Sequence, residues 1–211
     1  MAPPTLQLQA SAEGPLQRTQ SDTSAVVNYI HGEMTTNAGG SDVAYIRGQF
    51  ATARALGWIP GGAIVGLVNI YNAYKRWYDL VKTGGVWDHK SAIRSAYGDW
   101  SMDSSTNTEY FYDIWSNVHY GYIGKACGFP DWDLLAGAGA AQVMAGTVPD
   151  GYWSRRFEEL GDADFLAAFD DPKDQAAIRL GMRLWGSGGA GISSAAILSA
   201  ARADAANLST R

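Results

Sequence analysis

The sequence predicts an all-α fold, a single compact domain of about seven to nine helices behind a flexible N-terminal leader. Apolar residues recur at steps of three and four along most of the chain, which is the period of an amphipathic helix. Capping residues and glycines punctuate this pattern, and runs that alternate strictly between apolar and polar residues are few. With 46% hydrophobic and 18% charged residues among 211, the chain can bury a substantial core.

The leader is predicted over residues 1–20, where early prolines and repeated Leu-Gln pairs show no helical period. Such a segment is either a plain disordered terminus or a tag for a secretion or injection apparatus. Residues 21–211 are predicted to form the domain. No charged start followed by an apolar block marks a signal peptide, so we expect synthesis in the cytoplasm and export without a classical signal. The apolar stretch 63–74 is too short to span a bilayer, and no membrane insertion is expected.

Each helical segment is bounded by capping residues or proline at its start and, in most cases, by glycine at its end. A stretch rich in Ser, Thr, Asp and Asn separates the first helices from the later ones and predicts a loop. The expected segments are a helix capped by Ser21 or Asp22, helices from Ser41 to Gly57, from Pro60 to Gly84 and over Ser91–Tyr97, a loop over 98–108, and helices over 109–127, from Pro130 through Ala138, from Asp171 to Gly186 and from Ala195 to Ala206.

The segment 112–124 is the densest in groups that bind ligands or transfer protons. It holds a carboxylate, an amide, an imidazole, three tyrosines and a tryptophan, whereas a core helix is normally apolar because buried polar groups need partners. Asp113 and His119 are six residues apart, about 120° around a helix, so their side chains cannot pair directly. If both serve one site, that site must lie across the boundary between two neighbouring faces of the helix. Two neighbouring faces result, one with Asp113, Asn117 and Tyr120 and the other with Trp115, His119 and Tyr122.

Four acidic or basic residues outside this segment, Asp88, His89, Lys90 and Glu33, are further candidates. His119 itself can act as a general acid or base, or it can be a packed histidine bonded to a carbonyl group. In the string 87–90, Asp88 is expected to cap a helix, while His89 and Lys90 lie at its positive end and can hold an anion or be solvated. Glu33, a lone acid on an apolar helix, can have a raised pKa and act as an acid, or simply lie in water.

Three glycines, Gly121, Gly124 and Gly128, lie in or after the same helix and each costs helix stability. Close helix packing explains them better than close approach of a ligand.

Composition and spacing narrow the function classes. A net charge of −5 and a pI near 5.1 argue against broad electrostatic binding to nucleic acid, although a local patch can still serve a nuclease. The single cysteine, Cys127, excludes an intrachain disulfide and is expected to be a small buried residue. Metal-ligand spacings, a phosphate-binding loop and a serine nucleophile elbow are all missing from the sequence, so neither a metal nor a cofactor is expected.

The motifs resemble the bacterial polymorphic toxin type 44 family in order and spacing, from about His31 to Trp185. The resemblance implies an all-helical toxin module, often at the end of a larger secreted protein, with a cognate immunity protein and a nuclease activity on RNA. By motif it carries over Asp88, His89, Lys90, Asp113, Asn117, His119 and Tyr122, together with Asp171 and Asp174. The strings that carry the resemblance are Trp87-Asp88-His89-Lys90, residues 112–124, Gly128-Phe129, Gly137-Ala138-Gly139 with Gln142, and Asp171-Pro172 with residues 174–179.

Two enzymatic hypotheses and one non-enzymatic hypothesis follow. In a metal-independent RNase, His119 and either His89 or Asp113 would move protons, and Lys90 would stabilise phosphate charge. In a cell-wall glycan hydrolase, Asp113 would pair with Glu33 or Asp88 around a glycosidic bond. A cargo or binding protein would need none of these groups. Substrate contacts are expected from Lys90, Asn117, Trp115, Tyr120 and Tyr122.

Overall fold

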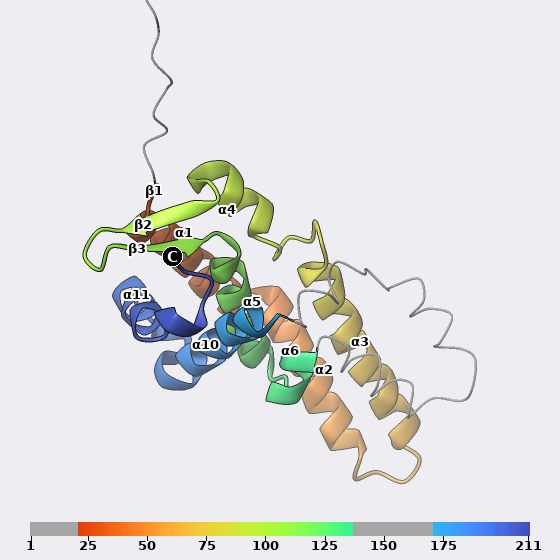
Figure 1. Ribbon diagram of the computed structural model, residues 1–211. Coiled ribbons are helices and arrows are strands. Elements are labelled where there is room, and N and C mark those ends of the chain that lie inside the picture. Colours follow the sequence, from red (N-terminus) through yellow and green to blue (C-terminus); the bar gives the residue numbers. More distant parts are fainter. Residues whose placement is uncertain (1–20, 137–170) are drawn as a thin grey trace, which may run out of the picture.

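The computed structural model describes residues 21–136 and 171–211, and the predicted leader over residues 1–20 lies outside them. Eight α-helices and a three-stranded sheet make up the described part, which confirms the predicted helical fold (Figure 1). The helices are α1 (Thr23–Ala38), α2 (Ser41–Leu56), α3 (Ala63–Val81), α4 (Lys90–Tyr97), α5 (Asp113–Cys127), α6 (Asp131–Ala136), α10 (Pro172–Gly188) and α11 (Ser194–Ala203). The strands are β1 (Ser21–Asp22), β2 (Trp100–Asp103) and β3 (Thr108–Phe111), and short 3-10 turns follow at η1 (Gly189–Gly191) and η2 (Ala205–Asn207).

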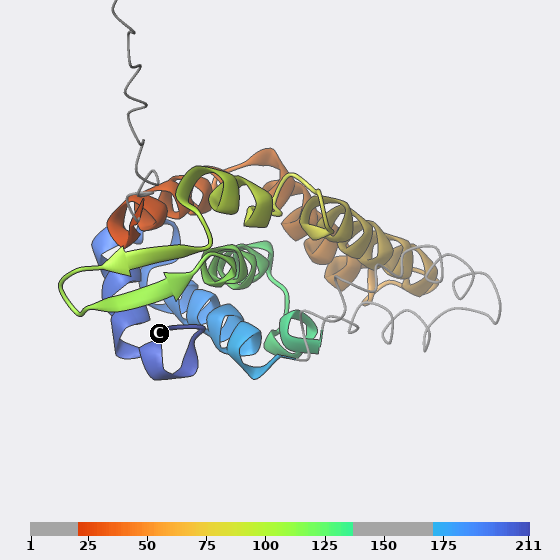
Figure 2. The ribbon, with the colours of Figure 1, turned by 45° about the horizontal axis from the view of Figure 1, so that its top comes forward.

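Helix α5 is the centre of the fold. Twelve of its 15 residues are buried, and Figure 2 shows it with α4 on one side and α10 on the other. Its partners differ from one face to another. Aromatic side chains of α3 and the α3–α4 loop pack beside Tyr120 and His119, while α10 lies against Val118 and Gly121. The helix that carries most of the predicted site residues is therefore also the main core element.

Two of the predicted helix starts are confirmed and two are wrong. The Asp22 carboxylate accepts a hydrogen bond from the Ser24 amide at 2.7 Å, and Asp171 caps α10 through the Lys173 amide at 2.8 Å. The residue before α2 is Gly40, with no side-chain cap, so Ser41 is the first helical residue instead. Helix α3 begins at Ala63 rather than at Pro60. The predicted continuation of α6 to Ala138 lies outside the described residues.

The region 98–111 corrects the sequence prediction. A loop followed by a helix was expected, but β2 and β3 form an antiparallel hairpin with Trp100 opposite Phe111, and β1 pairs with β2 in parallel. The buried positions of β2 are Ser101 and Asp103, so the strand buries its polar residues, opposite to the usual alternation. The Ser, Thr, Asp and Asn residues of this stretch predicted a loop. The prediction was wrong because the buried polar side chains have hydrogen-bond partners in distant parts of the sequence, which a local pattern does not reveal.

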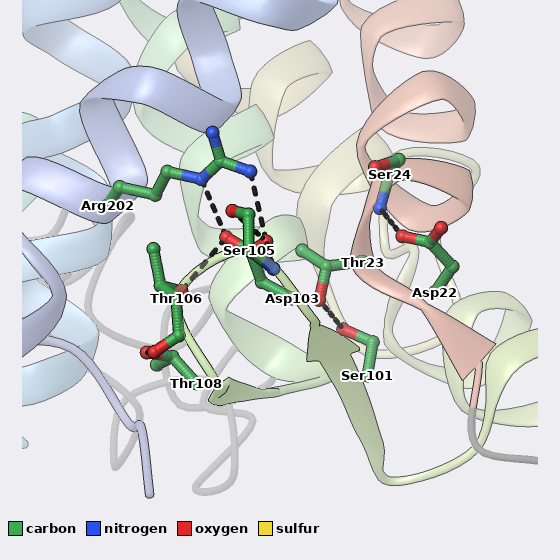
Figure 3. Close-up of polar contacts among 9 residues, drawn as sticks. All are labelled: Asp22, Thr23, Ser24, Ser101, Asp103, Ser105, Thr106, Thr108 and Arg202. Carbon is green, nitrogen blue, oxygen red and sulfur yellow. Dashed lines mark hydrogen bonds and ion pairs between the residues drawn. The ribbon is translucent and has the colours of Figure 1, made fainter.

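Those partners come from α1 and α11 (Figure 3). The Ser101 hydroxyl accepts a hydrogen bond from Thr23 at 3.1 Å, and the Arg202 guanidinium holds Asp103 through two hydrogen bonds of 2.6 and 2.9 Å. Arg202, assisted by the Ser105 and Thr106 hydroxyls, keeps the pKa of Asp103 well below its ordinary value. The hairpin is thereby fixed to both ends of the described chain. The last residues extend the sheet, because Glu109 and Arg211 exchange two backbone hydrogen bonds.

Candidate functional site

Two carboxylates at the N-terminal ends of α5 and α10 belong to one electrostatic cluster, because Asp113 acts on the charge of Asp174. Asp113 is the first residue of α5, and Asp174 lies in the first turn of α10. One turn along α5, the buried Asn117 amide donates a hydrogen bond to Asp174 Oδ1 at 3.0 Å. In contrast to Asp174 Oδ1, the carboxylate oxygen Oδ1 of Asp113 is buried without a hydrogen-bond partner in the described part of the chain. An unpartnered buried carboxylate oxygen is expensive, and such groups concentrate at functional sites.

The environment raises the pKa of both carboxyl groups. Burial, followed by repulsion from Asp113, raises the pKa of Asp174 from 3.8 to about 6. Burial also raises the pKa of Asp113, with a smaller opposing effect from Lys90. Because the two groups repel each other, the first proton binds to the pair and not to a single isolated residue. At about pH 6 this arrangement holds a proton on Asp174 in about half of the molecules.

Two further charged residues of opposite sign in the described part of the chain act on this pair. Lys90, the first residue of α4, lowers the pKa of both Asp113 and Asp174, while the exposed Asp171 raises both. Three carboxyl groups therefore share one nearby lysine.

A second cluster contains the histidines. The rings of His89 and His119 are in edge-to-face contact, with centroids 4.3 Å apart and an angle of 79° between their planes. His119 is 0% exposed and His89 is 4% exposed. Burial lowers the pKa of His89, and burial followed by the neighbouring His89 lowers that of His119 well below its ordinary value. Both imidazoles are therefore neutral at pH 7.

Side chains of α1 orient the two rings. The Asn37 amide nitrogen lies 3.0 Å from His119 Nε2 and 3.4 Å from Glu33 Oε2, so it can donate to both and fixes the neutral tautomer of His119 with its proton on Nδ1. The Tyr29 hydroxyl lies 3.1 Å from His89 Nδ1. His119 Nδ1 and His89 Nε2 are buried without partners in residues 21–136 and 171–211. Glu33 thus lies beside the histidines and not beside Asp113.

The histidine pair predicts a pH dependence of stability. Because the folded-state pKa of His119 lies below 6.5, the unfolded chain binds more protons on acidification, and stability is lost as the pH falls. We expect His119→Phe to remove about 2 kcal/mol of the change in the free energy of unfolding between about pH 7 and pH 5. Urea unfolding across that range measures it. The matched control is Tyr122→Phe, which removes the 2.5 Å hydrogen bond to the Gly189 carbonyl and should lower stability without changing the pH slope. Equal slopes in wild type and His119→Phe would refute this assignment.

The remaining predicted residues have mainly structural contacts. Asp88 accepts hydrogen bonds from the Gly84 and Lys90 amides, at 3.0 and 3.2 Å, and so holds the start of α4, although the helix begins at Lys90 and its N-cap residue is His89 instead of Asp88. Trp115 and Tyr122 are fully buried in the core, where they are not available as a sugar-stacking surface. Tyr120 is partly buried and packs on the Trp77 ring at 5.0 Å. Their predicted roles in substrate binding rest on the sequence alone.

Helix packing explains the glycines of α5, as predicted. A Cβ atom built on Gly121 would lie 2.0 Å from the Ile178 carbonyl oxygen, and one on Gly124 would lie 2.4 Å from the Leu134 side chain. Gly128 ends α5 with φ at 94°, a left-handed conformation that favours glycine. The close approach of α10 to Gly121 is also what brings Asp174 to the N-terminal end of α5.

Asp174 is the partner of Asp113 that our sequence reasoning did not choose. Its position three residues after Asp171 indicated an ordinary helix start, and only the family resemblance included it. The pairings predicted instead, Asp113 with Glu33 or Asp88, stay predictions, and the charged residues whose effect on Asp113 is resolved are Lys90 and Asp171. No local sequence signal identifies Asp174 as a site residue. Its place beside α5 becomes visible only once the packing of α10 against α5 is known.

No group of three or more His, Cys, Asp or Glu side chains within the described ranges is arranged to hold a metal ion. In the same ranges, a helix that combines the length and the apolar character needed to cross a membrane is not found. Cys127 is buried, as expected, and burial raises the pKa of its thiol.

Comparison with known families places this site within a matched region. The family described as Bacterial toxin 44 matches residues 76–187, which is more than half of the 211-residue chain. The match includes Lys90, Asp113, Asn117 and Asp174, as well as both histidines of the pair, and it begins after α1 and α2. Comparison with curated proteins gave no match, and comparison with solved structures gave none either.

Proposed function

We propose that this chain, which belongs to the Bacterial toxin 44 family and is a toxin or effector domain, hydrolyses glycosidic bonds of cell-wall glycan. The observation that carries the proposal is the carboxylate pair Asp113–Asp174, in which the pKa of Asp174 is raised to about 6. Glycoside hydrolases need one protonated and one ionised carboxyl group on either side of the scissile bond. The contacts of this pair fit that requirement better than the histidine pair fits phosphodiester cleavage.

The two carboxyl groups have distinct roles in this proposal. Protonated Asp174, oriented by Asn117, would donate its proton to the glycosidic oxygen as the bond to the anomeric carbon breaks. Ionised Asp113, whose Oδ1 has no partner in the described residues, would take a proton from the attacking water or attack the anomeric carbon itself. Lys90 is placed to keep one of the two carboxyl groups ionised.

The alternative, a nuclease acting on RNA, finds less support in the geometry. A pair of general acid and base groups must leave room for the phosphate between them, whereas the His89 and His119 rings are already in contact at 4.3 Å. Both rings are held neutral by burial, so they attract no phosphate charge. The negative balance around Lys90 opposes an anionic substrate as well.

We further propose, from the family, that a cognate immunity protein binds this domain and that the domain acts after export. Occlusion of Lys90 and Asp113 by that partner would be the most direct way to block the site.

A substrate comparison tests the proposed function. Purified wild type and Asp113→Asn would be incubated with peptidoglycan and, separately, with total RNA. We expect wild type to release soluble glycan fragments and to leave RNA intact, and we expect the variant to lose about 10²–10⁴-fold of its rate, the usual contribution of such a group. Asp131→Asn, at an exposed Asp paired with Lys125, is the control for loss of a surface charge. RNA cleavage that is abolished in His119→Ala but retained in Asp113→Asn would replace this proposal with the nuclease.

A further inference from the structure

The α2–α3 hairpin carries a cluster of exposed apolar residues at its tip. Trp58 is 91% exposed and Ile64 is 75% exposed, and both lie at the turn that Figure 1 places far from the sheet. Single exposed apolar residues are normal, but a contiguous cluster indicates a binding surface. We call these residues the hairpin tip, and its members, all more than half exposed, are Trp58, Ile59, Ile64, Val65 and Val68.

The charge of the hairpin is opposite to that of the chain. Residues 43–78 contain no Asp or Glu, although the net charge of the whole chain is −5. The same stretch contains four cations, of which Lys75 and Arg76 form ion pairs with acids at its two ends. Arg47 and Arg54 form no ion pair with any residue of the described chain. An apolar tip beside two arginines that have no acidic partner in residues 21–136 and 171–211 suits a bilayer, which has an apolar interior and, with anionic lipid, a negatively charged surface.

A hollow of about 400 Å³ lies between these two arginines. Arg47 and Arg54 are two turns apart on α2, and Phe50 and the buried Cys127 contribute its apolar lining. Gly48 also lines it, and a Cβ atom built there would meet nothing within 4 Å. The hollow thus combines two cations with an apolar lining, which is the chemistry of a phosphate group attached to a hydrocarbon.

We propose that the α2–α3 hairpin docks on an anionic phospholipid bilayer. The hairpin tip enters the interface between headgroups and acyl chains, where tryptophan is favoured, and Arg47 and Arg54 bind lipid phosphates through the hollow. Arg54 precedes Trp58 by about one helical turn, so its guanidinium lies at the headgroup level when the tip is buried. The hairpin lies in the interface and does not cross the bilayer.

A second copy of the chain is a poorer occupant of the same surface. Two hairpins packed tip to tip would bring Arg47 and Arg54 of both chains together without an acid in residues 43–78 to compensate. A bilayer containing anionic lipid supplies both the apolar layer and the compensating charge. This surface involves none of the carboxyl groups of the proposed active site, so the two proposals stand or fall separately.

Vesicle binding of the full chain tests the proposal. Vesicles of phosphatidylcholine alone would be compared with vesicles containing phosphatidylglycerol, by flotation at low and high salt. We expect strong binding only to the anionic vesicles, about thirty-fold weaker binding in Arg47→Gln/Arg54→Gln from the usual contribution of a cation near a charged surface, and loss of binding in Trp58→Ser/Ile64→Ser.

Two matched variants control for general effects of charge and exposure. Val86→Ser removes an apolar side chain that is 73% exposed in the α3–α4 loop, and Arg179→Gln removes an exposed cation of α10. Both should bind vesicles like wild type, and all variants should keep the thermal midpoint of wild type, because the substituted side chains are exposed. Equal binding to neutral and anionic vesicles would overturn the proposal. So would a dimer, detected by light scattering, that Trp58→Ser/Ile64→Ser converts to a monomer.

Discussion

Asp174→Asn is expected to lower glycan hydrolysis by roughly 10²–10⁴-fold, because asparagine keeps the shape of the side chain but cannot donate the proton of a carboxylic acid. The rate of the wild type should decrease as the pH rises above about 6, the pKa to which burial and Asp113 raise this group. This decrease in rate above about pH 6 should be absent from the pH profile of the residual activity of Asp174→Asn. Initial rates of fragment release between about pH 4.5 and pH 8.5 measure both effects.

The same substitution should make the fold more stable at neutral and alkaline pH. A carboxyl group whose folded-state pKa is raised stabilises the fold fully below its unfolded pKa, and that contribution is lost as the pH rises through the folded pKa. A rise from 3.8 to about 6 corresponds to an upper limit of about 3 kcal/mol. Since Asp174 is partly exposed and Asn117 would need a new partner, we expect an actual gain of about 1–2 kcal/mol above about pH 7 and none below about pH 4.

Asp131→Asn is again the control, because Asp131 lies on the surface in an ion pair with Lys125. It should change neither the rate nor the pH dependence of stability. A variant Asp174→Asn that is less stable than wild type at about pH 8 would show that Asp174 has a structural role and that its burial serves the fold. Full activity in Asp174→Asn would exclude it as the acid even if the stability gain were observed.

Gly121→Ala and Gly181→Ala are expected to produce large losses of stability. A Cβ atom at Gly121 would lie 2.0 Å from the Ile178 carbonyl oxygen, and one at Gly181 would lie 2.0 Å from the Val118 carbonyl oxygen. Both obstacles are backbone atoms of a packed helix pair, so relief requires that α5 and α10 move apart. We expect a loss of roughly 3–5 kcal/mol, comparable to the largest effects of core substitutions, for Gly121→Ala and for Gly181→Ala.

Gly32→Ala is the matched control, because Gly32 lies within α1 and a Cβ atom there would meet nothing within 4 Å. It should raise stability by about 0.5–1 kcal/mol through the higher helix propensity of alanine. Urea unfolding of the three variants measures the effects. If Gly121→Ala folds with the stability of wild type, the α5–α10 contact is looser than the structure shows. The position of Asp174 beside Asp113 would then need another explanation.

Of the helix starts predicted from local signals, those at Asp22 and Asp171 are confirmed, whereas those at Ser41 and Pro60 are wrong. Asp22 and Asp171 cap their helices because each carboxylate accepts a hydrogen bond from the free backbone amide two residues later, a contact that the local sequence is enough to predict. The separation of Asp113 from His119 around α5 likewise follows from helical geometry alone, and the structure places them in separate clusters. The family resemblance carried by the motifs of residues 87–179 is confirmed by the match to residues 76–187.

The features that only the tertiary structure decided all depend on contacts between distant segments. Strand β2 was missed because Asp103 is a buried polar residue whose partner, Arg202, is 99 residues away. Asp174 joins Asp113 only because Gly121 and Gly181 allow α10 to approach α5 closely, and no local pattern states that distance. Sequence periodicity fixes which residues share a helix face, whereas long-range packing determines which faces meet, and the candidate site is a product of that second step.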